Sequence, residues 1–278
     1  MTDEFAQYVD GGIHASTAGN MFRMWGTFGA YGKSEVYPIG ISFHWPDSWD
    51  NLTPGESEEP RIGKLESLAK IAERANIPLI WFGEHKISWR SGQGTVEIGK
   101  IKHSGDGTFT KDLQTVKISE LEPTIQDLFD TDSDVDGGAY KPKNKKTNSF
   151  QEYTREYLPS SYVIQDFDIF VEKEPGDPAA LIEIKRSGIS PNSWTPYSND
   201  WPNYYLQLSL AEEADIEPIL LHHEKKLVED QQVGYYHNLE RPSSPDTNSD
   251  DSFLNWDKKI IPAHEARRKL QDCDFDPN

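Results

Sequence analysis

The chain has 278 residues, enough for one large domain or two modest ones, and its 8 Trp, 12 Tyr and 12 Phe supply bulky side chains for a core. Its single cysteine, Cys273, excludes an intrachain disulfide and fits a reducing compartment. No apolar run is long enough to cross a membrane, and residues 1–4 lack the basic start of a signal peptide. We therefore expect a cytoplasmic protein.

The charge balance is strongly acidic. The sequence contains 47 acidic and 28 basic residues, for a net charge of −19. Such a surface repels nucleic acid and suits a basic partner, or it is an adaptation to a salty cytoplasm, where high salt screens the repulsion between acids. The acids are spread along the chain rather than held in one block. That spread favours the second interpretation, a protein of a halophilic organism or of its virus.

The first half, residues 1–129, shares a series of short segments with the second half. Each half predicts an opening helix, a β-hairpin, a third extended piece, a helix and a further strand. The shared segments keep the same order in both halves, which indicates two tandem related copies. The matched segments are 5–8 with 150–153, 46–49 with 191–194, 72–80 with 211–220, Ile118 with Ile260 and Leu128 with Leu270.

Residues 130–147 separate the halves. The stretch begins acidic and small and ends in closely spaced lysines, a composition typical of a linker. Asp132, Asp134 and Asp136, followed by Gly137, also match the first positions of a calcium-binding EF-hand loop. Lys143 occupies the place of the acid that such a loop needs at its end, so a solvated linker is the preferred interpretation.

The second half, residues 148–278, opens on a predicted short helix with Phe150, Tyr153 and Leu158 on its apolar side. The apolar run 165–171, the turn-forming stretch 173–178 and the apolar run 180–185 then predict a β-hairpin. Successive side chains on a strand point to opposite faces. Glu183 and Lys185 should therefore project together, and Asp168 on the first strand should join them.

The remaining elements alternate between helix and strand. The pattern predicts a helix at 204–214, a buried strand at 218–222, a loop at 240–251 and a helix at 262–270. This alternation indicates an α/β fold in which a mixed central β-sheet is flanked by helices. His222 and His223 end the predicted strand, but adjacent residues face opposite ways and are poorly placed to bind one metal ion. A contact with substrate or a plain surface position is expected for them instead.

The predicted cluster of Asp168, Glu183 and Lys185 has the composition of a site for phosphodiester hydrolysis. Carboxylates are the ligands that Mg²⁺ or Mn²⁺ prefers, with water and phosphate oxygens completing the coordination. The carbonyl group of Ile184 is placed to add a further ligand. A bound divalent ion lowers the pKa of water, and a lysine nearby can orient that water or stabilise charge on the phosphate.

The pattern Asp168, Glu183-Ile184-Lys185 on a hairpin, followed by a helix with Gln207 and an apolar strand, resembles the PD-(D/E)xK nuclease superfamily. The resemblance covers about residues 148–224 and implies a restriction-endonuclease-like fold, a Mg²⁺ (or Mn²⁺) cofactor and DNA as partner. It implies that Asp168 and Glu183 are metal ligands and Lys185 is the catalytic lysine. Glu152 or Glu156 would match the acid that many members carry on the first helix, and Gln207 the polar residue that some carry on the later helix.

Two features depart from this pattern or compete with it. Phe167 stands where the family has proline, and Asp166 is a second candidate for the first metal ligand. Asp168 is preferred because an apolar strand starts directly after it. Alternating charges such as Glu183 and Lys185 are also common on the solvated face of an edge strand. The apolar character of the strand instead favours burial, and buried charges need partners.

The first half does not repeat this acid pair. At a constant offset, Arg23, Pro38 and Gly40 stand at the positions of Asp168, Glu183 and Lys185, and a shifted register brings Ser42 and His44 there instead. We therefore expect a catalytically dead copy, with Arg23 free to contact a phosphate, inside a homodimer or an intrachain pseudo-dimer. The alternative function is a non-catalytic scaffold, or a viral or mobile-element accessory protein, that uses an inert nuclease-like fold for protein contacts.

Overall fold

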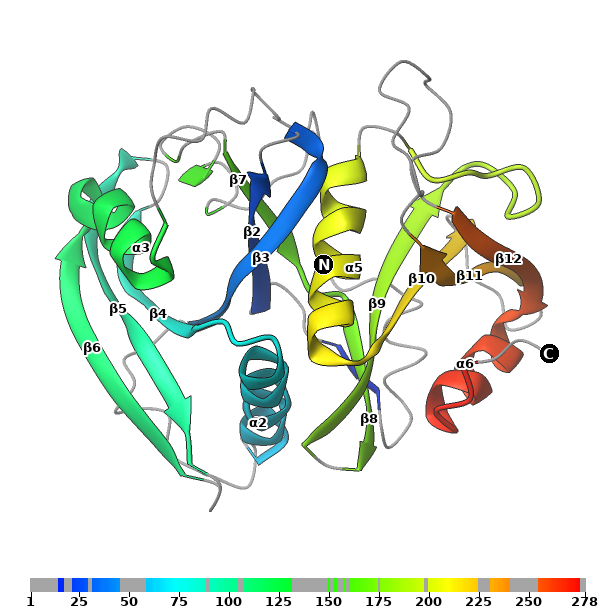
Figure 1. Ribbon diagram of the computed structural model, residues 1–278, viewed down its shortest axis with the longest axis horizontal. Helices are drawn as coiled ribbons and strands as arrows, with labels where there is room; N and C mark the ends of the chain where they lie inside the picture. The colour runs from blue at the N-terminus through cyan, green and yellow to red at the C-terminus, as the bar shows by residue number, and fades with distance from the viewer. Residues whose placement is uncertain are drawn as a thin grey trace.

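The computed structural model describes residues 15–17, 22–29, 32–45, 59–88, 91–104, 108–131, 150, 153–154, 158, 161–174, 176–197, 200–224, 231–240 and 255–275. These residues form a mixed α/β fold with two sheets and four α-helices, so the predicted α/β class is confirmed (Figure 1). The helices are α2 (Glu59–Arg74), α3 (Leu121–Phe129), α5 (Trp201–Ala214) and α6 (Ala263–Gln271), and a 3₁₀ turn, Ile118–Glu120, precedes α3.

One sheet is built mainly from the first half and the other mainly from the second. The first sheet has the order β6-β5-β4-β3-β2-β7 and the second the order β1-β8-β9-β10-β11-β12. The strands of the first half are β1 (Ala15–Thr17), β2 (Phe22–Gly29), β3 (Gly32–Trp45), β4 (Leu79–Ser88), β5 (Gln93–His103) and β6 (Phe109–Lys117). Those of the second half are β7 (Tyr162–Asp166), β8 (Ile169–Glu174), β9 (Asp177–Ser187), β10 (Glu217–Glu224), β11 (Gln232–Glu240) and β12 (Asn255–Pro262).

The two halves exchange their first strands. β1 pairs with β8 of the second half, and β7 pairs with β2 of the first half, both antiparallel. The chain thus passes from one sheet to the other twice, between β1 and β2 and between β7 and β8. Neither sheet is completed by one half alone, because each takes an edge strand from the other half.

The two sheets also share their topology. In each sheet one pair of neighbouring strands is parallel, β3 with β4 and β9 with β10, and a helix, α2 or α5, connects the two strands of that pair. Both helices end in the same way. Asn76 and Asp215 adopt left-handed φ values of 53° and 54°, and the next residue bonds to a carbonyl of the last helical turn in both cases. This is a common helix-terminating geometry, and Asn and Asp tolerate it better than most residues.

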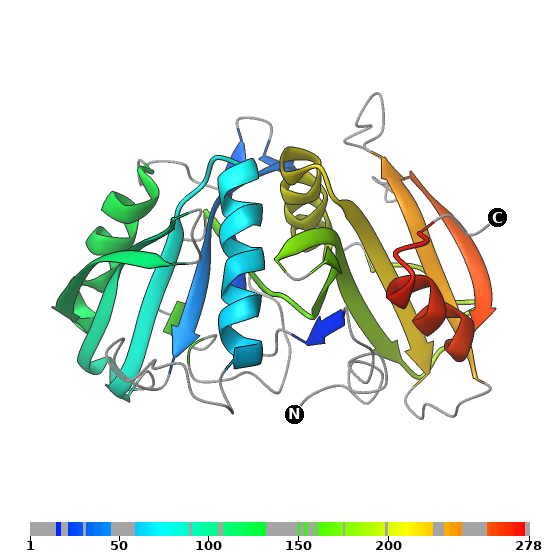
Figure 2. The ribbon, with the colours of Figure 1, turned by 90° about the horizontal axis from the view of Figure 1, so that it is seen from below.

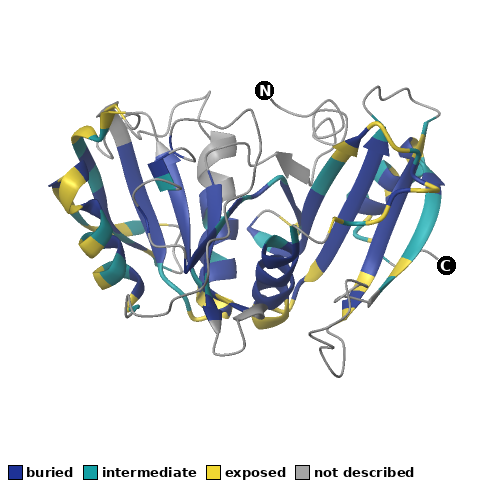
Figure 3. Cartoon of the chain, turned by 90° about the horizontal axis from the view of Figure 1, so that it is seen from above, coloured by how far each residue is buried: buried dark blue, intermediate teal, exposed yellow. Residues whose placement is uncertain are grey.

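The helices divide into an inner layer and two outer ones. α2 and α5 lie side by side between the two sheets, whereas α3 covers the outer face of the first sheet and α6 the outer face of the second (Figure 2). The inner layer is strongly apolar, and α5 is buried along most of its length (Figure 3). An amphipathic helix has one polar face; α5 lacks one because a sheet or another helix covers it on most sides.

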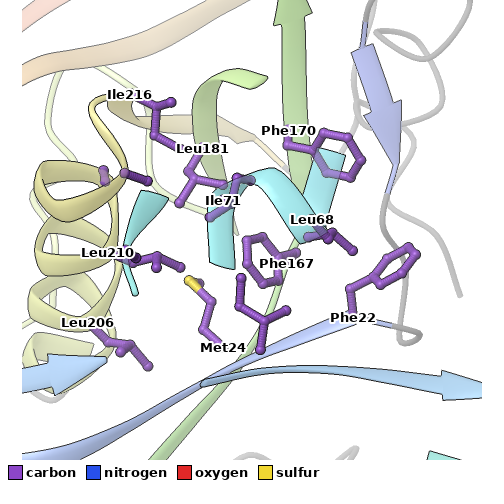
Figure 4. Packing of buried hydrophobic residues seen from close by; sticks show 14 of the residues in the cluster. Phe22, Met24, Leu68, Ile71, Phe167, Phe170, Leu181, Leu206, Leu210 and Ile216 are labelled. Atoms are coloured by element: carbon purple, nitrogen blue, oxygen red, sulfur yellow. The ribbon is translucent and has the colours of Figure 1, made fainter. Parts of the chain in front are cut away.

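The largest core cluster joins both halves. Phe22 and Met24 of β2 pack in the same cluster as Phe170 of β8 and Leu181 of β9, together with side chains of α2 and α5 (Figure 4). Burial of apolar surface is the main stabilising contribution to folding. Because this surface is shared, the two sheets stabilise each other across the inner helical layer.

Most of the elements predicted for the second half are confirmed. β8 and β9 form the antiparallel hairpin, the helix at 204–214 is α5, the strand at 218–222 is β10, and the helix at 262–270 is α6 shifted by one residue. Phe150, Tyr153 and Leu158 are buried in the core beneath α3, as expected for an apolar helix side. The EF-hand candidates Asp132, Asp134 and Asp136 lie outside the described residues, as does most of the predicted linker at 130–147.

The prediction of one continuous strand at 165–171 is wrong. β7 ends at Asp166 in the first sheet, and β8 begins at Ile169 in the second sheet. Phe167 and Asp168 form the crossing between them, and the Phe167 N–H donates to the Phe22 carbonyl over 3.0 Å. Asp168 therefore lies just before the hairpin rather than within its first strand. None of the described helices is long and apolar enough to cross a membrane.

Candidate metal centre between the two sheets

The crossing from β7 to β8 brings Asp168 next to Glu183. The antiparallel register that pairs Ile169 with Ile182 places Asp168 opposite Glu183, one residue further along. The backbone N–H of Ile184 donates to the Asp168 Oδ2 atom over 2.7 Å, which fixes the carboxyl group at the end of the hairpin. The predicted convergence of Asp168 with Glu183 is therefore present. We call these two carboxyl groups the acid pair.

Glu183 is held from two directions. Its side chain points into the inner layer, and the residue is only 8% exposed. The Oε1 atom lies 2.8 Å from the Lys185 Nζ atom, and the Oε2 atom accepts a hydrogen bond of 2.5 Å from the Gln165 Nε2 atom. Glu183 and Lys185 thus project together, as strand alternation predicts, while Ile182 and Ile184 pack on the other face beneath α6.

Lys185 connects the acid pair to the beginning of α5. Its Nζ atom lies 3.2 Å from the Asp200 Oδ2 atom and 5.3 Å from the centre of the Tyr204 ring. Burial by itself lowers the pKa of the Lys185 ammonium, but Glu183, then Tyr204 and Asp200, outweigh it and raise that pKa well above its ordinary value. Lys185 is therefore a permanent cation at neutral pH.

The surroundings of Asp168 favour its neutral form. Burial, and then the negative charge of Glu183, raise the pKa of the Asp168 carboxyl well above its ordinary value. The hydrogen bond from Ile184 and the charge of Lys185 act in the other direction but do not compensate. Two carboxyl groups beside a single ammonium leave an excess negative charge, which favours the uptake of a proton or of a cation.

The composition of this cluster suits a hard divalent cation. Mg²⁺ in proteins is commonly held by one or two carboxylates, with water and phosphate oxygens as the other ligands. The acid pair supplies two such carboxylates, and its excess charge is what a cation would neutralise. Within the described residues no group of three or more His, Cys, Asp or Glu side chains is arranged to hold a metal ion, so among these residues the acid pair and the backbone are the candidate ligands.

Comparison with family models, curated proteins and solved structures found no match for this chain. The assignment of a function therefore depends on the site itself.

The second candidate for the first ligand, Asp166, lies elsewhere. It ends β7 and points to the outer face of the first sheet, where its Oδ1 atom pairs with the Arg23 Nε atom over 2.9 Å. Arg23 is 2% exposed and its guanidinium stacks on the Phe150 ring at 4.3 Å. The prediction that Arg23 is free to contact a phosphate is wrong, because the guanidinium is buried and engaged within the protein.

Gln207 does not contact the acid pair either. It is 1% exposed, and its Nε2 atom donates to the carbonyl oxygens of Leu181 and Ile219, over 3.0 and 3.2 Å. Pro218 stands opposite Leu181 in the parallel pair of β9 and β10 and has no N–H to give to the ladder. Gln207 supplies donors to that part of the sheet. Glu152 and Glu156, the acids predicted on the first helix, lie outside the described residues.

The position equivalent to the acid pair in the first half is apolar. β2 and β3 pair Met24 with Ile41 and Phe22 with Phe43, as β8 and β9 pair Phe170 with Leu181, all facing the inner layer. This register matches Phe22 with Asp168 and Phe43 with Glu183. The two phenyl rings stack at 4.9 Å. An aromatic pair thus replaces the acid pair.

Both registers considered for the first half from the sequence are therefore wrong. Arg23, Ser42 and His44 lie on the outer face of the first sheet, where Ser42 bonds to the Trp25 indole and to His44, over 2.7 and 2.8 Å. Among the described residues, the register positions that correspond to Asp168 and Glu183 hold Phe22 and Phe43. The catalytically dead copy stays a prediction.

His222 belongs to a structural cluster beyond the end of the site. It stacks on Trp194 at 4.2 Å, and its Nε2 atom lies 2.9 Å from the Ser187 hydroxyl oxygen. Burial, and then the charges of His223 and Lys258, lower the pKa of His222 to about 4. A neutral imidazole packed in this way is a core residue, so the expected surface position is wrong because both His222 and His223 are buried.

Sequence reasoning missed Gln165 and Asp200. Gln165 had a signal, because it occupies the inward-facing position between Val163 and Phe167, where an apolar residue is expected. A polar residue on the apolar face of a strand needs a buried partner. The sequence signal for Asp200 was weaker. Its position at the start of a helix is common for an acid that has no role in a site.

Proposed function

We propose that this protein is a divalent-metal-dependent nuclease that hydrolyses phosphodiester bonds of DNA, with its active centre at the acid pair and Lys185. The observation that carries the proposal is the convergence of Asp168, Glu183 and Lys185 at one end of a buried hairpin. A buried carboxyl group and a half-buried one beside a single ammonium are unfavourable for stability alone, because part of their charge is left uncompensated. Such an arrangement is typical of a site whose charge a ligand completes.

Each residue has a distinct role in the proposed site. Asp168 and Glu183 would hold Mg²⁺ or Mn²⁺, with the backbone carbonyl of Ile184 as a further ligand. The bound ion would polarise the phosphate and lower the pKa of a water molecule. Lys185, which Asp200 and the Tyr204 ring keep in place, would orient that water and stabilise negative charge on the phosphate.

We further propose that the chain is a pair of tandem copies with a restriction-endonuclease-like fold in the second half. The common strand order, the matching parallel pairs and the matching ends of α2 and α5 support a duplication. The division into residues 1–129, 130–147 and 148–278 stays a prediction. The exchange of β1 and β7 adds that neither copy has a complete sheet of its own. The Phe22–Phe43 stack supports the proposal that the first copy has no catalytic centre.

The net charge of −19 determines the conditions under which this activity should be sought. An acidic protein attracts DNA weakly, and phosphate contacts weaken further as salt rises. Arg186 is exposed and follows Lys185 along β9, so it adds a positive charge nearby, although its side chain faces the other side of the strand. A cation bound by the acid pair would remove the nearest repulsive charge. We therefore expect that millimolar Mg²⁺ or Mn²⁺ is required for DNA binding as well as for cleavage.

Cleavage of plasmid and linear DNA with Mg²⁺ or Mn²⁺, over a series of salt concentrations, tests the proposal. The wild-type protein should cleave, and Glu183→Gln should reduce the rate by about 10²–10⁴-fold, as expected when a group acting on the reacting phosphate is removed. Glu174→Gln is the matched control, because Glu174 lies exposed at the far end of the same hairpin. Equal rates for the two variants would contradict the proposed site.

One observation favours a second candidate function, the non-catalytic scaffold. Lys185 and Gln165 already satisfy both oxygens of Glu183, so that carboxylate has partners without any ligand. In a scaffold the cluster would be a polar contact that links the two sheets. The scaffold predicts no cleavage with either metal at any salt concentration, and no loss of a partner interaction in Glu183→Gln if its fold is retained.

A further inference from the structure

Gln165 comes to the acid pair from the other sheet. It lies on β7, which pairs with β2 in the first sheet, whereas Glu183 lies on β9 in the second. The side chain is 6% exposed, projects into the inner layer and donates to the Glu183 Oε2 atom over 2.5 Å. Its own Oε1 atom is buried without a hydrogen-bond partner among the described residues. A buried amide oxygen without a partner is costly for stability, so the amide group is not placed there to satisfy its own polar atoms alone.

We infer that Gln165 is a positioning residue for Glu183, and that through it the first sheet takes part in the active centre. This inference rests on the proposed function, because it assigns Gln165 a role in presenting Glu183 to the cation. The amide donates to one carboxylate oxygen while Lys185 binds the other, so the plane of the carboxylate is fixed.

The strand that carries Gln165 is itself held by the first half. β7 pairs Gln165 with Met24 and Asp166 with Arg23 in an antiparallel ladder. The buried Arg23–Asp166 ion pair at 2.9 Å lies one residue from Gln165, on the opposite face of the strand. The first half, which has no acid pair, thus fixes the strand that orients the acid of the second half. Because β7 pairs with the first sheet, the exchange of strands affects how Glu183 is oriented for binding a cation.

The alternative is that Gln165 only satisfies a buried polar atom and has no effect on ligand binding. The two roles differ in one measurable quantity, the affinity for the cation. A residue that only stabilises the fold changes the melting temperature and leaves cation affinity unchanged once the protein is folded. A residue that orients a metal ligand changes the affinity, typically by about 10–100-fold.

The experiment measures Mn²⁺ affinity by calorimetry on the full-length chain and on Gln165→Met, which keeps the volume and removes the donor. Ser209→Ala is the matched control, because its hydroxyl is a buried donor of the same layer and bonds to the Val36 carbonyl over 2.7 Å, away from the acid pair. We expect Gln165→Met to bind Mn²⁺ about 10–100-fold more weakly, and Ser209→Ala to bind like the wild type.

Unchanged affinity in Gln165→Met, with Mn²⁺ bound normally by the wild type, would overturn the role of Gln165 and leave the proposed function intact. Absence of Mn²⁺ binding by the wild type would overturn both. If Gln165→Met fails to fold, Gln165→Asn replaces it. Asparagine keeps the amide but is one methylene too short to reach Oε2, so the same loss of affinity is expected and an unchanged affinity again contradicts the inference.

Discussion

Replacing Lys185 with methionine is expected to lower the free energy of unfolding by about 2–4 kcal/mol, because it leaves two largely buried acids without their cation. The Lys185 Nζ atom is the counter-charge for Glu183 and Asp200, at 2.8 and 3.2 Å. Methionine fills much of the same volume, so the loss would come from charge rather than from a cavity. Denaturant unfolding at pH 7 without divalent cations measures the change. The same substitution should abolish any DNA cleavage.

Two further variants test whether the loss of stability in Lys185→Met comes from charge or from packing. Lys173→Met changes an exposed lysine on the same hairpin and should alter stability by less than about 0.5 kcal/mol. Adding Glu183→Gln to Lys185→Met removes one unpaired acid and should recover a substantial part of the loss. Additive effects of Glu183→Gln and Lys185→Met would show that the two side chains are not coupled, against the contact described here.

Replacing Asp168 with asparagine should have the opposite effect on stability. The raised pKa of Asp168, caused first by burial and then by Glu183, means that the folded protein favours the protonated carboxyl. Stability should therefore fall as pH rises from about 4, the ordinary value for Asp, through the raised pKa, and stay low above it. Asparagine removes this cost and can still accept the hydrogen bond from Ile184. It should stabilise the metal-free protein by about 1–3 kcal/mol at pH 8.

Unfolding of both proteins across pH 4–8 tests this sign. The difference between Asp168→Asn and the wild type should be near zero at pH 4 and should grow with pH. Added Mg²⁺ should stabilise the wild type and leave the variant unchanged, because a ligand that binds only the folded state raises its stability. A variant that is less stable than the wild type at pH 8 without metal would mean that Asp168 is not under electrostatic strain.

The sequence could predict those parts of the site that depend on residues close together in the chain. Glu183 and Lys185 share one strand, so alternation alone places them on one face, and the turn residues between 173 and 178 predict the hairpin that brings Asp168 close. The strand break at Phe167 could not be predicted in this way. Residues 165–171 alternate as one strand would, and only the pairing with β2 on one side and β9 on the other divides them.

Contacts between the two halves were the least predictable features. Nothing local to residues 162–166 indicates that their partner is β2 rather than β8, because strand pairing over long separations is set by the assembled core. The register of the first half shows the same limit. A shift of one residue exchanges the two faces of a strand. Sequence matches therefore selected the polar residues Arg23 and Ser42, whereas the inward-facing equivalents are Phe22 and Phe43.

Diffraction from crystals soaked in Mn²⁺, recorded for its anomalous signal, tests most directly whether the acid pair is a metal centre. We expect one strong peak within about 2.0–2.3 Å of carboxylate oxygens of both Asp168 and Glu183, at distances usual for hard divalent ions. The peak should vanish in crystals of Glu183→Gln. A peak only at other residues, or none at millimolar Mn²⁺ with the site open to solvent, would contradict the metal centre and the nuclease function built on it.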